Sequence, residues 1–229
     1  MSAKPVSIRV NDASVSGLWQ KPAAAKAVLV LAHGAGAGMA HPWMTAAADG
    51  LGARGIATLR FNFPYMERGS KRPDAPALAH AAVRAACAEA ARLGPGLPLF
   101  AGGKSYGGRM TSQAQSAEPL AGVRGLVFFG FPLHPAGAPG TDRAKHLDAV
   151  KVPMLFLQGT NDALADLKLL KKVVAGLGAR ATLSLSEHAD HSFHVPAKFG
   201  GNDAAVMASV LDAARDWMIA HAVDGASQG

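Results

Sequence analysis

Hydrophobic positions follow two different rhythms along the chain. Near the N-terminus, apolar and polar residues alternate over Val6–Val10 and Val15–Trp19, with Asn11-Asp12 between them, which predicts an antiparallel hairpin. Further along, short runs are almost purely apolar, as is typical of strands buried on both faces of a parallel sheet. These runs predict strands at Ala27–Ala32, Ile56–Phe61, Leu97–Ala101, Leu126–Phe129, Met154–Leu157 and Ala181–Leu185.

Helical patterns lie between these runs. The predicted helices are Trp43–Arg54, Ala77–Leu93, Gly107–Glu118, Leu164–Gly176 and Asp203–Ala222. Alternation at the spacing of β-α-β units predicts an α/β fold, with a mainly parallel central sheet of about eight strands and helices on both faces. Phe131–Val152 holds prolines, glycines and room for one short helix, so it is too small for a cap domain. We expect residues 1–229 to form one domain with a frayed tail over 224–229.

Composition and charge narrow the class of protein. Apolar residues make up 49% of the chain and charged residues 17%, which excludes a disordered chain. The net charge is +7, but the basic residues are scattered and no aromatic residues interleave with them, so we expect no nucleic-acid partner. The single cysteine, Cys87, allows no intrachain disulfide, and its alanine-rich helix predicts a packed thiol. Apolar runs too short for a signal peptide or a membrane span predict a cytoplasmic protein without a membrane partner.

Candidate chemistry begins at Gly103-Lys104-Ser105-Tyr106-Gly107, which has the G-x-S-x-G pattern of a nucleophile elbow. The pattern alone is weak, because about one chain in six of this composition would contain it by chance. Its context is stronger: a predicted strand precedes it, a predicted helix follows it, and Gly102 and Gly108 add small residues where the two elements crowd together. Ser105 is therefore a candidate nucleophile, and its hydroxyl would stand at the tip of a strained turn.

The sequence matches two nucleotide-binding motifs and a metal-binding pattern only in part. A P-loop ending at Ser105 would need glycine where the chain has Pro98, and the Gly34–Gly38 turn has Met39 where a dinucleotide fingerprint needs its third glycine. Three histidines share one loop, but no cysteine or second ligand cluster accompanies them. We therefore expect neither a cofactor nor a metal.

A nucleophilic serine needs a base, and the base needs an orienting acid. In a fold of this kind the chain order is serine, then acid, then histidine. Met154–Leu157 runs into a glycine-containing turn that delivers Asp162, although this carboxylate could instead cap the next helix, and Asp166 is a weaker candidate. After the last predicted strand, one loop offers three candidate bases: His188, His191 and His194.

An oxyanion formed at Ser105 would need two backbone N–H donors. The residue after the serine, Tyr106, would supply one from the start of its helix. The small-residue turn after the first central strand would supply the other from Ala35, unless this turn is flexible and without a role. His33, at the start of that turn, is expected to be structural and to bond the loop backbone.

Together these segments resemble the α/β-hydrolase superfamily. In many small hydrolases of this kind the base lies in a segment like Asp190-His191-Ser192-Phe193, so the resemblance implies His191 as the base. More narrowly, Arg60–Tyr65 and Gly102–Arg109 resemble a cap-less branch near the dienelactone hydrolases, in a group that includes a testis-expressed protein and a histone-acetyltransferase complex subunit. Dienelactone hydrolases carry a cysteine nucleophile, whereas this chain has Ser105, which argues against a dienelactone substrate.

The function predicted from the sequence is carboxylesterase-like hydrolysis of a small or exposed ester, by a monomer or homodimer, through Ser105, Asp162 and His191. Because some relatives in that group are thought not to be enzymes, a non-catalytic binding or scaffold protein remains an alternative, as does acyl transfer or peptide hydrolysis by the same residues. The charged segment Tyr65–Ala75 is expected near the mouth of the site, where it would favour acidic substrates or simply be solvated. Trp43 and Met44 would line the pocket or pack the following helix.

Overall fold

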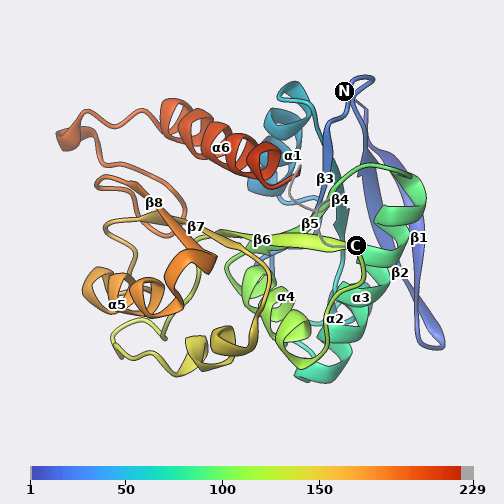
Figure 1. Ribbon diagram of the computed structural model, residues 1–229, viewed down its shortest axis with the longest axis horizontal. Helices are drawn as coiled ribbons and strands as arrows, with labels where there is room; N and C mark the ends of the chain where they lie inside the picture. Colours follow the sequence, from blue (N-terminus) through green and yellow to red (C-terminus); the bar gives the residue numbers. More distant parts are fainter. Residues whose placement is uncertain (1, 223–229) are drawn as a thin grey trace.

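The computed structural model describes residues 2–222 and is built on an eight-stranded sheet of order β1-β2-β4-β3-β5-β6-β7-β8 (Figure 1). β1 pairs with β2, and β2 with β4, in antiparallel fashion. The six remaining strands run parallel, which confirms the mainly parallel sheet predicted from the apolar runs. The strands are β1 (Lys4–Val10), β2 (Ala13–Gln20), β3 (Ala27–Ala32), β4 (Ile56–Phe61), β5 (Leu99–Lys104), β6 (Val123–Phe129), β7 (Met154–Gly159) and β8 (Ala181–Ser186).

Helices cover both faces of this sheet (Figure 1). α1 and α6 pack on one face, and α3, α4 and α5 pack on the other. The helices are α1 (Pro42–Ala53), α2 (Pro64–Glu67), α3 (Pro76–Leu93), α4 (Tyr106–Ala117), α5 (Leu167–Leu177) and α6 (Asp203–Ala220), with short 3-10 helices η1 (Asp142–Ala149), η2 (Gly178–Arg180) and η3 (Ala197–Phe199).

Strand β3 shows why the central strands are apolar throughout. Val28 and Val30 pack into the core under α3, α4 and α5, whereas Leu29 and Leu31 pack into the core under α1 and α6. Every residue of β3 is buried, because helices cover both sides of the sheet. Cys87 is also buried, on α3, and burial raises the pKa of its thiol to about 12.

Several predicted boundaries differ from the structure; β6, for example, begins at Val123 and not at Leu126. β5 begins at Leu99 and continues to Lys104, because the N–H of Leu97 is already used in a turn, where it donates to Gly94 O at 3.1 Å. The predicted helix at Leu164 begins instead at Leu167, because the carboxylate of Asp166 accepts from Leu169 N and caps it there. The segment predicted as a loop from Tyr65 opens with the short helix α2.

The carboxyl ends of the parallel strands are left open. Between β6 and β7 the chain forms only the 3-10 helix η1, and residues 2–222 contain no inserted cap domain. None of the helices in this part of the chain is long and apolar enough to cross a membrane. The loops that follow β3, β5, β7 and β8 therefore meet at one accessible edge of the sheet.

Candidate active site

Ser105 occupies a strained turn between β5 and α4. Its backbone has φ of +51° and ψ of −115°, a region that residues with a Cβ rarely adopt. The turn is held on both sides, because Ser105 N donates to Phe129 O at 3.1 Å and Arg109 N donates to Ser105 O at 3.1 Å. A Cβ on Gly103 or Gly107 would lie 2.3 or 2.4 Å from Ala32 O, so the glycines of the pattern are needed for close backbone packing.

Asp162 follows β7 and points at a histidine. Its Oδ2 lies 2.7 Å from His191 Nδ1 and also accepts from Gln158 Nε2, while its Oδ1 accepts from Leu164 N at 2.8 Å. The side chain is fully buried. The helix-cap role that the sequence left open belongs to Asp166 instead, so the structure separates these two carboxylates.

Of the three histidines in the loop after β8, His191 is the one that contacts Asp162. His194 pairs with Asp203 at 2.8 Å on the surface, and the ring of His188 stacks on Phe199 with centroids 4.0 Å apart. The structure thus brings together the acid and base favoured by the resemblance, and it directs the two alternative histidines elsewhere.

The His191 loop is held beside the serine turn, but no hydrogen bond within residues 2–222 joins Ser105 to the His191 ring. Lys104, which precedes the serine, donates from Nζ to His191 O at 2.5 Å. Gly130 lies against the same ring, since a Cβ added there would be 3.3 Å from His191 Cε1. Catalytic hydrogen bonds are often long before substrate binds, so this arrangement is compatible with a serine–histidine pair.

Lys104 is a site residue that the sequence reasoning did not identify. Its Nζ lies 5.7 Å from the ring centroids of both Trp43 and Phe193. Burial lowers the pKa of Lys104 to about 8, against the opposing effect of the carboxylates of Asp162 and Asp190. The position was one of the unspecified residues of the G-x-S-x-G pattern, and only the fold shows that it ties the elbow to the histidine loop.

The low pKa of Lys104 makes stability depend on pH in a testable way. The folded state releases this proton near pH 8, whereas the unfolded chain holds it to about pH 10.5, so the folded protein gains stability as pH rises between those values. Relative to Lys104→Met, the wild type should gain about 1–3 kcal/mol in unfolding free energy between pH 7 and pH 10. Urea titrations of both proteins at the two pH values measure this. If the difference in unfolding free energy between wild type and Lys104→Met is the same at pH 7 and pH 10, the pKa of Lys104 is not lowered in the folded state.

The turn after β3 is held by hydrogen bonds to two side chains, those of His33 and Tyr65. Phe63 N donates to His33 Nε2 at 3.1 Å, so the proton lies on His33 Nδ1, which donates to Gly34 O at 2.7 Å. Burial lowers the pKa of His33, which keeps the ring neutral in this structural role. Gly36 N donates to the hydroxyl of Tyr65 at 3.0 Å, which anchors the other side of the turn.

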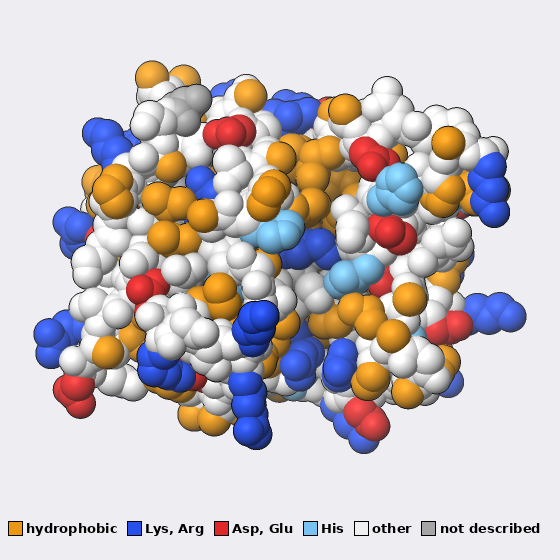
Figure 2. Space-filling view, turned by 180° about the vertical axis from the view of Figure 1, so that it is seen from behind, with side chains coloured by type: hydrophobic (Ala, Val, Ile, Leu, Met, Phe, Trp, Pro, Cys, Tyr) orange, Lys and Arg blue, Asp and Glu red, His pale blue; other side chains and the backbone are white. Residues whose placement is uncertain are grey.

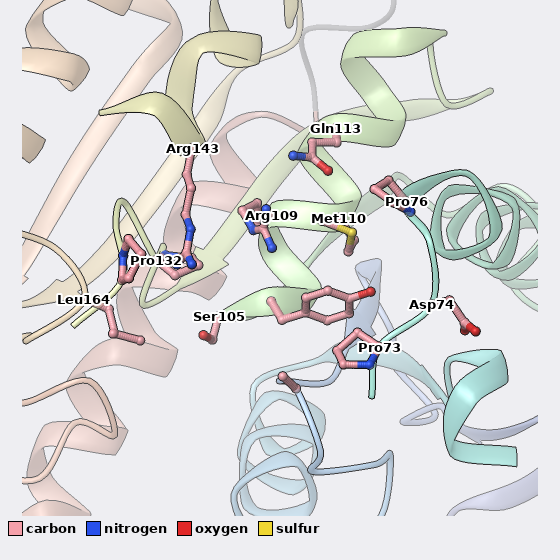
Figure 3. Close-up of a pocket in the computed structure, with 13 residues that line it drawn as sticks. Pro73, Asp74, Pro76, Ser105, Arg109, Met110, Gln113, Pro132, Arg143 and Leu164 are labelled. Atoms are coloured by element: carbon pink, nitrogen blue, oxygen red, sulfur yellow. The ribbon is translucent and has the colours of Figure 1, made fainter. Parts of the chain in front are cut away.

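A cavity of about 480 Å³ opens beside Ser105 (Figure 3). Ala35 and Tyr106, the residues predicted to supply oxyanion donors, line it together with the serine. The remaining lining residues come from several elements: Pro73, Asp74, Pro76, Arg109, Met110, Gln113, Pro132, Pro135, Arg143 and Leu164. Figure 2 shows histidine and basic side chains gathered around a hollow in the middle of one face of the molecule.

Parts of the pocket differ from what the sequence suggested. From the charged segment Tyr65–Ala75, Pro73 and Asp74 reach the wall, while Arg68 pairs with Asp74 instead of facing the cavity. Trp43 and Met44 line a separate cavity of about 140 Å³ next to Lys104. Within residues 2–222, no group of three His, Cys, Asp or Glu side chains is arranged to hold a metal ion.

Comparison with known proteins identifies the family. A family model described as an alpha/beta hydrolase domain matches residues 25–219. The chain belongs to the α/β-hydrolase family. This membership supports a hydrolase in general terms and confirms the resemblance noted in the sequence.

Solved structures share the fold at low sequence identity. A dienelactone hydrolase from Anabaena variabilis is 22% identical, with a TM-score of 0.73, 96% of this chain covered and 97% of that one. XC6422 from Xanthomonas campestris, described as a serine hydrolase without lid, is 19% identical, with a TM-score of 0.74 and 95% of each chain covered. The esterase domain of a Rhodothermus marinus protein is 16% identical, with a TM-score of 0.72, 96% of this chain covered and 99% of that one. These likenesses support the cap-less α/β-hydrolase fold.

Proposed function

We propose that this α/β hydrolase is a serine carboxylesterase that cleaves small or exposed esters. The observation that carries the proposal is the 2.7 Å contact between Asp162 and His191, at the same edge of the sheet as the strained Ser105 turn. A buried carboxylate bonded to Nδ1 leaves Nε2 of the imidazole free to accept a proton. That is the tautomer a serine nucleophile requires.

The residues would act in two half-reactions. In the first, Ser105 Oγ attacks the ester carbonyl carbon while His191 Nε2 takes the hydroxyl proton, and His191 then gives that proton to the departing alcohol. In the second, water attacks the acyl-serine ester, His191 takes a proton from the water and returns it to Ser105, and the carboxylic acid leaves. Asp162 stabilises the imidazolium in both steps, and the N–H groups of Ala35 and Tyr106 hold the oxyanion.

The shape of the pocket bears on the size of the substrate. The cavity beside Ser105 is about 480 Å³, within the range that suits a small molecule. Without a cap domain over it in the described part of the chain, the site offers little surface to cover a long acyl chain. Short or exposed esters therefore fit it better than lipids.

A series of p-nitrophenyl esters tests this preference. We expect kcat/KM to show no increase from butyrate to decanoate, because methylenes that stay in water gain none of the about 0.8 kcal/mol per methylene that burial would supply. The same series with His191→Ala serves as the control and should show only background hydrolysis. Turnover of every ester at the same rate by both proteins would favour the scaffold alternative, in which the fold is kept without catalysis.

A further inference from the structure

Two arginines face the cavity beside Ser105 from different elements. Arg109 lies in the first turn of α4, which begins directly after Ser105, and Arg143 lies in η1, on the segment between β6 and β7. Figure 3 shows both side chains extending towards the cavity on the same side of the serine. Their positive charges are close enough that Arg143, after burial, contributes to lowering the pKa of Arg109.

Neither guanidinium is neutralised by the protein within residues 2–222. No ion pair in this part of the chain involves Arg109 or Arg143, and the neighbouring acid of η1, Asp142, pairs with Lys145 at 2.7 Å. Arg109 Nε is buried and has no hydrogen-bond partner. A buried donor without a partner costs free energy, so the guanidinium of Arg109 keeps a hydrogen-bonding capacity that residues 2–222 leave unused.

The one carboxylate on the cavity wall is already engaged. Asp74 forms an ion pair with Arg68 and accepts a hydrogen bond from Tyr65 N at 2.8 Å, and its side chain is only 3% exposed. The carboxylate of Asp74 is therefore already paired within its own loop. The wall beside Ser105 keeps two positive charges, flanked by the amide of Gln113 and by apolar residues such as Met110 and Leu164.

We propose that Arg109 and Arg143 form a carboxylate-binding subsite, so that the preferred substrate is an ester with a carboxylate a few bonds from the scissile carbonyl. The inference rests on the proposed esterase function and adds the substrate class to it. Planar guanidinium groups bind carboxylates through paired, charge-assisted hydrogen bonds. The apolar wall would contact the hydrocarbon between the carboxylate and the ester.

Two matched pairs of esters test the subsite and locate the anion. The monoester of adipic acid with 4-methylumbelliferone differs from the hexanoate ester by a terminal carboxylate on the acyl side. The pair 4-acetoxyphenylacetate and 4-acetoxyphenylacetamide carries the same difference on the leaving-group side. In one of the two pairs we expect wild-type kcat/KM to favour the anionic ester at least tenfold.

The arginine variants show whether the preference comes from this wall. In Arg109→Gln and in Arg143→Gln, the ratio of anionic to neutral kcat/KM should fall about tenfold to hundredfold, because a charge-assisted bond is lost. Arg9→Gln removes the same charge from an exposed position on β1 and should leave the ratio as in wild type. Ratios near one in both pairs, or ratios insensitive to both arginines, would overturn the subsite.

Binding without turnover separates this inference from the proposed function. Calorimetry with Ser105→Ala should detect at least one of the two anionic esters, the adipate monoester or 4-acetoxyphenylacetate. The dissociation constant of that ester should rise at least tenfold in Ser105→Ala/Arg109→Gln. If wild type hydrolyses no ester but this arginine-dependent binding persists, the esterase proposal fails and the subsite stands. If neutral esters are hydrolysed and the arginine has no effect on binding, the subsite is wrong and the esterase proposal stands.

Discussion

Replacing Ser105 with alanine should lower kcat/KM for ester hydrolysis by about 10⁴-fold or more, because the variant cannot form the acyl-enzyme. The loss should fall on kcat, since the cavity walls that bind the substrate are unchanged. Folding should be affected little, because Ser105 is only half-buried and its backbone, not its hydroxyl, makes the bonds that hold the turn. Steady-state kinetics with p-nitrophenyl butyrate, together with a thermal melt of each protein, measure both effects.

Ser112→Ala is the matched control, because Ser112 is a serine of the same helix region that contacts a histidine away from the cavity. Its hydroxyl lies 2.7 Å from His146 Nε2, but the residue is fully buried and no substrate could reach it. Burial lowers the pKa of His146 to about 4, with further lowering by the charges of Arg109 and His80, so this ring stays neutral. Ser112→Ala should lose stability, by about 1–2 kcal/mol, and keep its ester hydrolysis. If Ser112→Ala lost ester hydrolysis and Ser105→Ala kept it, Ser105 would not be the nucleophile.

Asp162→Asn should cost about 10²- to 10⁴-fold in kcat, the second-largest effect we expect. Oδ2 of Asp162 accepts from both His191 Nδ1 and Gln158 Nε2, and Oδ1 accepts from Leu164 N. An asparagine amide has one oxygen and two N–H groups, so it cannot accept all three bonds. If its nitrogen faces the imidazole, it imposes the tautomer with the proton on Nε2, which cannot take the serine proton.

Asp166→Asn separates this role from helix capping. Asp166 caps α5 through Leu169 N, and asparagine caps a helix about as well as aspartate. We therefore expect Asp166→Asn to keep both its stability and its kcat. Equal losses of kcat in Asp162→Asn and Asp166→Asn would indicate that both carboxylates affect catalysis only by stabilising the conformation of their loop.

The bounds of the strands could be predicted where buried positions carry apolar side chains. The bounds of β3 and β4 match the runs seen in the sequence, because every residue of both strands is buried. The predicted end of β5, Ala101, is too early, because Gly102 and Gly103 have no apolar side chain that would mark them as buried strand residues. They nevertheless belong to the strand, and a Cβ on Gly102 would lie 1.8 Å from Val127 O.

Sequence patterns could select candidate residues for the site, but not the contacts that those residues make in space. The G-x-S-x-G pattern between a strand and a helix selected Ser105, the chain order selected Asp162, and the resemblance selected His191 from three neighbours. Sequence could not show that His194 is engaged by Asp203, since that pairing depends on where α6 begins. It also could not show that Arg109 and Arg143 converge, because their meeting depends on how η1 folds back over α4.

A fluorophosphonate reaction followed by mass spectrometry tests the central claim most directly. This reagent phosphonylates a serine hydroxyl only where a neighbouring base activates it. We predict one adduct per wild-type chain, mapped to the peptide that carries Ser105, with loss of ester hydrolysis in proportion to labelling. Ser105→Ala should carry no adduct, and Asp162→Asn should react far more slowly. Equal labelling of wild type and Ser105→Ala, or ester hydrolysis that survives complete labelling of Ser105, would contradict the account.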